Sequence, residues 1–140
     1  MKLDRYTEKA QEAVLAAQRM ATDADSPILD AEHILAALLA DAEGTPYITL
    51  KDPEIGADPA KLSVELAAVL SRRAKIHGGS MSIDPRAQQL IQNAEDEARR
   101  LGDEYVSTEH LLLASSKAGG DAQRLLEAAG ATHETILKAL

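Results

Sequence analysis

The stretch Tyr105-Val106-Ser107-Thr108-Glu109-His110-Leu111-Leu112-Leu113-Ala114 has a weaker copy earlier in the chain, at an offset of 77 positions. The copy reads Ile28-Leu29-Asp30-Ala31-Glu32-His33-Ile34-Leu35-Ala36-Ala37. In the same register, residues 7–39 align with residues 84–116 without a gap and share eight identities in 33 pairs. Self-similarity at a fixed offset indicates a duplication. We therefore predict two pseudo-symmetric halves that bury one shared core.

Apolar residues recur at three- and four-residue spacings in both halves, which is typical of amphipathic helices. The predicted helices start at residues 7, 30 and 58 in the first half and at 84, 107, 121 and 132 in the second. Residues 41–57 are predicted to be a loop with one helical turn near Tyr47–Leu50, because glycine and proline interrupt the pattern. No segment alternates with a period of two, so we expect an all-α fold without a sheet.

The domain organisation follows from the repeat. We predict one domain over residues 1–140, with repeat one at 1–76, a glycine-containing linker at 77–82 and repeat two at 83–140. One detail differs between the halves. Ser115-Ser116 stands where the first half has Leu38-Leu39, so we expect that helix end to be less buried. On the helix that starts at residue 84, we expect Leu101 to point inward. Because Leu140 lies on an apolar helix face, we also expect the natural chain to continue.

Composition excludes several classes of protein. Hydrophobic residues make up 45% of the chain but include no Phe or Trp, so the core must consist of aliphatic side chains. Lys plus Arg is 15 and Asp plus Glu is 23, which gives a net charge of −8. Such a chain is repelled by nucleic acid and by anionic membranes. No apolar run approaches the roughly 20 residues of a membrane span, and no signal peptide is visible.

No catalytic motif is present in the sequence. The phosphate-binding pattern G-x-x-x-x-G-K-[ST] is absent, and so is the nucleophile elbow G-x-S-x-G. The four histidines are isolated and there is no cysteine, so we expect no metal site. We expect no catalytic residue and no cofactor in this chain.

The doubled Glu-His pair at a helix start has two interpretations. Glu32 and Glu109 can complement the helix dipole while His33 and His110 hydrogen-bond at the first turn, which would be structural. Alternatively, the free amides of a helix start attract an anionic group, and a carboxylate beside them attracts a guanidinium. The second interpretation predicts two equivalent docking points for a charged peptide segment.

The sequence resembles the doubled N-terminal domain of Clp-type AAA+ unfoldases. The resemblance lies in Met1–Thr7 with Ala10-Gln11, in Glu32–Leu35, in Tyr105–Leu112 and in Leu126–Ala131, and it extends over essentially the whole chain. It is greatest to the ClpB disaggregases, while the paired Glu-His is shared with ClpC. It implies two four-helix repeats without enzymatic activity, tethered to a hexameric motor that holds ATP and Mg²⁺.

The resemblance also implies where partners bind. In ClpB-type domains, unfolded or aggregated polypeptides are engaged at positions matched here by Thr7, Asp103 and Glu109. In ClpC-type domains, the two repeat glutamates, here Glu32 and Glu109, bind phosphoarginine on marked substrates, and other members bind adaptor proteins. We also expect Ile91 and Tyr105 to line an apolar groove.

Together these expectations describe a cytoplasmic domain, monomeric by itself, that presents polypeptides to its motor. The alternative is a ClpC-like reader of phosphoarginine or adaptors, and a purely structural role in gating the motor ring stays open. Ala31 stands where the second half has Thr108, so the two docking points need not be equivalent.

Overall fold

The structure, a computed structural model, describes residues 3–76 and 80–140. Within them the chain forms helices α1 (Glu8–Asp23), α2 (Ala31–Leu39), α3 (Thr45–Leu50), α4 (Pro59–Ser71), α5 (Pro85–Arg100), α6 (Thr108–Ser115), α7 (Gly120–Ala128) and α8 (His133–Ala139), with two short strands, β1 (Ile28–Leu29) and β2 (Ser82–Ile83). The all-α prediction is confirmed. Of the expected linker 77–82, residues 77–79 lie outside the described part, and Ser82 belongs to β2.

The two halves are related by the offset found in the sequence. Helices α1 and α2 correspond to α5 and α6 at 77 positions, and α4 and α8 begin 74 positions apart. The expectation of no sheet is wrong in detail, because β1 pairs with β2 in parallel, Leu29 opposite Ile83. Tyr6 makes an isolated parallel bridge with Val106. The offset of 77 maps the Leu29–Ile83 pairing onto the bridge between Val106 and Tyr6. In both places, a short extended segment of one half pairs with a short extended segment of the other half.

Polar side chains fix where the helices begin. Thr7 caps α1, its hydroxyl accepting a hydrogen bond from the Ala10 amide at 3.2 Å. Asp84 caps α5 at the equivalent position, and Asp58 caps α4 by accepting from the Lys61 amide. These caps satisfy amide groups that have no partner within the helix.

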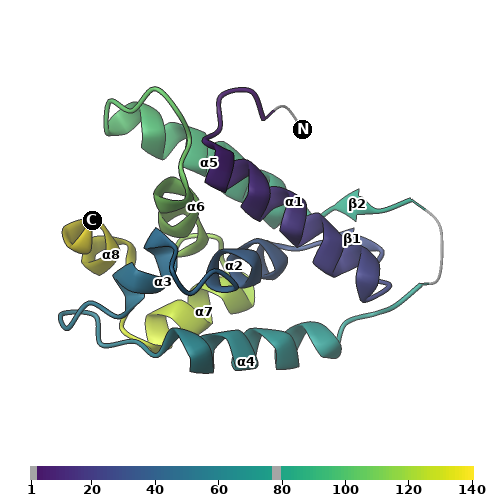
Figure 1. Ribbon diagram of the computed structural model, residues 1–140. Helices are drawn as coiled ribbons and strands as arrows, with labels where there is room; N and C mark the ends of the chain where they lie inside the picture. The colour runs from purple at the N-terminus through teal and green to yellow at the C-terminus, as the bar shows by residue number, and fades with distance from the viewer. Residues whose placement is uncertain (1–2, 77–79) are drawn as a thin grey trace.

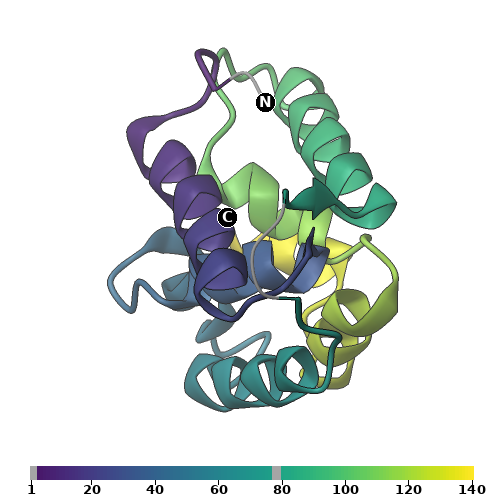
Figure 2. The same cartoon turned by 90° about the vertical axis from the view of Figure 1, so that its right-hand side faces the viewer.

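Helices α2 and α6 form the centre of the molecule and pack on each other. Around them lie α1 and α5 on one side and α4 and α7 on the other (Figures 1 and 2). The central helices are apolar on almost every face, so they are enclosed. Their large apolar residues that are fully buried are Ile34, Leu35, Leu111, Leu112 and Leu113.

One expectation for a single segment is confirmed and three are wrong. The helical turn predicted near Tyr47–Leu50 is present as α3, which starts at Thr45 because Gly44 caps it and Pro46 fits its first turn. The apolar pattern predicts that the helix starting at residue 58 ends near Lys75, but α4 ends at Ser71. Leu101 is 46% exposed because it follows the last residue of α5.

The third correction concerns the end of α6. Ser115 and Ser116 are buried, and their hydroxyls donate to the Leu111 and Leu113 carbonyls at 2.8 and 2.6 Å. A serine hydroxyl bonded to its own helix carries no unsatisfied polar group into the core. The polar sequence therefore does not make this helix end less buried.

Candidate functional site

The starts of α2 and α6 share one geometry, in which a histidine caps its own helix. His33 Nδ1 accepts from the Asp30 amide at 2.9 Å, and His110 Nδ1 accepts from the Ser107 amide at 2.8 Å. Both rings are buried. An accepting Nδ1 carries no hydrogen, so both neutral rings carry their proton on Nε2. The structural interpretation of the two histidines is confirmed.

Ser107, His110 and Asp103 lie in a line that resembles a catalytic triad. His110 Nε2 lies 2.8 Å from Asp103 Oδ2, and Nδ1 lies 3.1 Å from the Ser107 hydroxyl. However, the Nδ1 lone pair already receives the Ser107 amide hydrogen. A base must have a free lone pair to take a proton from the hydroxyl. This arrangement is a helix cap rather than an activated serine.

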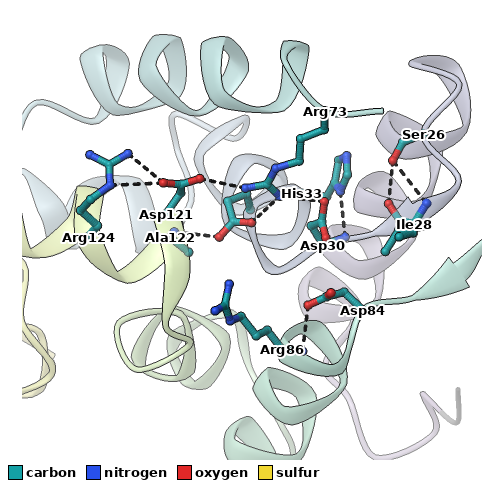
Figure 3. Close-up of polar contacts among 11 residues, drawn as sticks. Ser26, Ile28, Asp30, His33, Arg73, Asp84, Arg86, Asp121, Ala122 and Arg124 are labelled. Atoms are coloured by element: carbon teal, nitrogen blue, oxygen red, sulfur yellow. Dashed lines mark hydrogen bonds and ion pairs between the residues drawn. The ribbon is translucent and has the colours of Figure 1, made fainter. Parts of the chain in front are cut away.

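The Glu32 carboxylate is enclosed in a network between both halves. Its Oε1 accepts from Arg73 Nη1 at 2.6 Å, and its Oε2 accepts from the Ala122 amide at the start of α7 at 2.8 Å. Arg73 also donates to Asp30 at 2.7 Å and to Asp121 at 3.0 Å. Figure 3 shows Arg73 reaching from the end of α4 between Asp30 and Asp121. Glu32 is only 4% exposed, so it is not available to a ligand.

Charge pairing in this network shows in the pKa values. Burial alone would lower the pKa of Arg73, but hydrogen bonds from its guanidinium to Glu32 and Asp30 raise it above its ordinary value. The Arg124 guanidinium, and then that of Arg73, lower the pKa of Asp121. Arg73 and Asp121 are therefore both charged at neutral pH, and their contact is an ion pair.

Glu109 occupies the position equivalent to Glu32 but has different surroundings. It is half-buried in the first turn of α6, and within residues 3–76 and 80–140 no hydrogen bond or ion pair reaches its carboxylate. Asp103 accepts from the ring of His110, the residue after Glu109, and the Thr7 amide donates to the Val106 carbonyl at 2.9 Å. The structure thus gathers Thr7, Asp103 and Glu109 at one helix start, while Glu32 lies apart in the network at the start of α2.

The predicted apolar pair does not meet. Ile91 lines a groove of about 980 Å³ between α1 and α5, together with Leu29 and Ile83. Glutamine, serine and threonine side chains form its rim, and among the described residues that line it none is charged. Tyr105 is 49% exposed and is not part of this groove.

Sequence reasoning missed Arg73, which is the hub of the network. Arg73 lies 41 residues from Glu32 and sits among several basic residues, so no local signal marks it. The described residues hold no cluster of three potential metal ligands. None of the helices formed by residues 3–76 and 80–140 has the length and hydropathy that a membrane span requires.

Comparison with known proteins identifies the architecture. A family model for the Clp repeat (R) N-terminal domain matches residues 5–138. The chain belongs to this family. It is 36% identical over 133 residues to the chaperone protein ClpB of Corynebacterium diphtheriae, in an alignment that covers 93% of this chain and 15% of that protein. It is 33% identical over 134 residues to the chloroplastic ClpC of Pisum sativum, covering 95% and 14%.

The fold agrees with solved Clp N-terminal domains. The N-terminal domain of Hsp104 from Candida albicans superimposes with a TM-score of 0.80 at 18% identity, over 97% of this chain and 89% of that one. The chain spans only about 15% of the length of the ClpB relative. It is thus a Clp N-terminal domain of the kind that ClpB-type chaperones carry.

Proposed function

We propose that this domain captures unfolded or aggregated polypeptides for a ClpB-like disaggregase, and that the start of α6 is its contact point. The observation that carries the proposal is the Glu109 carboxylate, which no hydrogen bond or ion pair reaches within residues 3–76 and 80–140, at the helix start that Thr7 and Asp103 also contact. A half-buried carboxylate without a partner gains more from a cationic or hydrogen-bonding ligand than a solvated one does. Glu32 already forms an ion pair with Arg73, so a ligand would stabilise its charge less.

The groove at Ile91 supports the same function. Its apolar floor suits hydrophobic side chains, and its uncharged amide and hydroxyl rim suits the polar groups of a peptide backbone. A domain that meets many different unfolded chains benefits from a surface without fixed charge. In this proposal the domain is cytoplasmic, itself without a cofactor, and joined to an ATP-driven motor.

The test is binding of a fluorescently labelled unfolded protein, such as casein, measured by anisotropy. Glu109→Gln removes the charge and is expected to weaken binding about tenfold, equal to about 1.4 kcal/mol. The control is Glu104→Gln, which makes the same charge change at an exposed position nearby. Equal affinities for the wild type and both variants would remove the α6 site from the proposal.

A second candidate function, reading of phosphoarginine, is favoured by the Arg73–Glu32 contact. The Arg73 guanidinium donates a hydrogen bond to the Glu32 carboxylate at the start of α2. A glutamate at this position of the helix can therefore bind a guanidinium group. Glu109 has the same position on α6 and its carboxylate is open. If this function holds, calorimetry with free phosphoarginine gives one site per domain rather than two, and Glu109→Gln abolishes it. Absence of heat at millimolar ligand, with casein binding intact, would leave the first function alone.

A further inference from the structure

The first half contains an apolar cleft that the proposed function does not use. It encloses about 440 Å³ between α1, α2 and α4, within the size range of ligand pockets. Met20, Ala36, Ala67 and Leu70 contribute apolar surface to it. Its volume and lining suit a compact hydrocarbon group.

The cleft follows from small residues on the helices that line it. Ala24 and Ala36 stand where the second half has Leu101 and Leu113 at the offset of 77. Leu113 is fully buried and fills its space in the second half. The smaller side chain of its counterpart, Ala36, leaves the equivalent space in the first half unfilled. The repeat thus identifies the cleft as a local departure from a filled core.

One donor of a buried side chain is open to this cleft, and no group within residues 3–76 and 80–140 accepts a hydrogen bond from it. His33 is 3% exposed and lines the cleft, and its Nδ1 accepts from the Asp30 amide, so the proton is on Nε2. In Figure 3 the His33 ring turns its other nitrogen away from Asp30, towards the segment that carries Arg73. Across residues 3–76 and 80–140, no hydrogen bond reaches His33 Nε2, and no enclosed polar side-chain atom there lacks a partner, so this nitrogen is open to the cleft.

The second half shows which group would satisfy this donor. There, Asp103 Oδ2 accepts from His110 Nε2 at 2.8 Å. The counterpart of Asp103 is Ser26, whose hydroxyl donates instead to the Ile28 carbonyl at 2.7 Å. A carboxylate is therefore present at this position in one half and missing in the other.

The charges around the cleft suit an anion. Lys75 and Arg73 line it; Arg73 is already paired with carboxylates of the Glu32 network, whereas Lys75 makes no ion pair within the described ranges. Burial lowers the pKa of His33, and the nearby Asp30 opposes this effect without reversing it. His33 is thus a neutral donor at pH 7, and a carboxylate at Nε2 would also be attracted by the Lys75 ammonium.

We propose that the cleft between α1, α2 and α4 binds an apolar carboxylate, with the hydrocarbon group against Ala36, Ala67 and Leu70 and the carboxylate on His33 Nε2. The ligand supplies the acceptor that Asp103 supplies in the second half. Two sources share this chemistry: a free small acid, and the last residue of a polypeptide that ends in an apolar side chain.

The experiment is an NMR titration of the whole domain, following the Ala36 and Ala67 methyl groups and the His33 ring nitrogens. The probes are 4-phenylbutyrate for the free acid and the peptide acetyl-Gly-Gly-Leu with a free carboxylate for the chain end. The expected result is saturable shifts with a dissociation constant of about 1 mM or lower for at least one probe. The probe that binds identifies the source. Failure of both to shift these signals overturns the proposal.

Matched controls isolate the carboxylate contact. 4-Phenylbutanol and the peptide amide keep the apolar group without the charge and are expected to bind at least tenfold more weakly. Ser26→Asp places an internal carboxylate at the position equivalent to Asp103 and is expected to exclude both probes while the fold is kept. His33→Asn keeps an acceptor for the Asp30 amide but has no donor at the Nε2 position, so it should also lose binding. Unchanged affinity in Ser26→Asp, or equal affinity for alcohol and acid, contradicts the proposal.

These outcomes are independent of the function proposed for α6. Casein binding is expected to be unchanged in Ser26→Asp, since Ser26 lies in the other half. Loss of the cleft ligand with retention of casein binding would separate the two sites.

Discussion

The Arg73 guanidinium lies 2.6 Å from the Glu32 carboxylate, and this contact makes the two halves of the molecule unequal. The same acidic position on α6, Glu109, carries no such partner in the part of the chain that the structure describes. One helix start is therefore used to hold α2, α4 and α7 together, while its copy is left open. Duplication followed by such divergence leaves one enclosed helix start and one open helix start within one fold.

Loss of Arg73 is expected to destabilise the domain strongly. Arg73→Met leaves the buried Glu32 carboxylate without its cation, which costs about 3 kcal/mol in the free energy of unfolding. Urea denaturation followed by circular dichroism measures this change. Arg124→Met is the control, because Arg124 pairs with Asp121 at the surface and its loss costs less than about 1 kcal/mol. Similar losses in both variants would show that the Glu32 network is not an enclosed one.

The stability of the domain is expected to fall as the pH drops below the ordinary histidine range. Burial lowers the pKa of His33 in the folded state, while in the unfolded chain it titrates near 6.5. The unfolded state therefore binds more protons in acid, so the stability present above this pH is lost as the pH falls towards the folded-state pKa.

Unfolding free energies at pH 7.5 and pH 5.5 measure the effect of His33. In His33→Asn, which keeps an acceptor for the Asp30 amide but does not titrate, the difference between the two pH values should shrink. A difference as large as that of the wild type would assign the pH dependence to other groups.

The sequence predicted the features that depend on local pattern or on the repeat. The offset of 77, the one shared core and the caps at Thr7 and Asp84 could all be predicted from spacing and residue type. The different environments of Glu32 and Glu109 could not. They depend on Arg73 and on the start of α7, which lie far from α2 in the sequence and meet it only after folding.

The end of α6 illustrates a second reason for wrong predictions. Ser115-Ser116 looks polar as a sequence, but a hydroxyl that donates to its own helix behaves as a small buried side chain. Similarly, α3 starts before the turn predicted near Tyr47–Leu50, because Gly44 and Pro46 break a helix in its interior but favour its start. In both cases the residue type alone suggested an exposed or interrupted helix. The position of the residue within the helix decided whether its hydroxyl was satisfied or its backbone fitted.

Ser115 provides a test of this explanation. Ser115→Leu introduces the residue that the first half has at Leu38, but Ser115 is fully buried in space shaped for a smaller side chain. Such overpacking costs about 1–3 kcal/mol. Ser115→Ala is the control and should change stability by less than about 1 kcal/mol, because the Leu111 carbonyl keeps its place in the helix. Thermal unfolding of both variants distinguishes the cases, and a stabilising Leu would mean that the site has unfilled room.

Gly130 is expected to be intolerant of any side chain because it joins the two halves at close range. Its φ is +88°, and a Cβ there would lie 2.8 Å from the Ile55 carbonyl oxygen in the connection between α3 and α4. Gly130→Ala therefore combines a left-handed backbone with a steric clash and should cost more than about 2 kcal/mol. Gly102→Ala is the matched control, since Gly102 has a φ of +75° but nothing within 4 Å of the added Cβ, and only the backbone cost of about 1 kcal/mol applies. Urea midpoints for the two variants separate the clash from the backbone effect. Equal midpoints would indicate that the α3–α4 connection moves aside, and that contact between the halves at this point is weaker than its geometry implies.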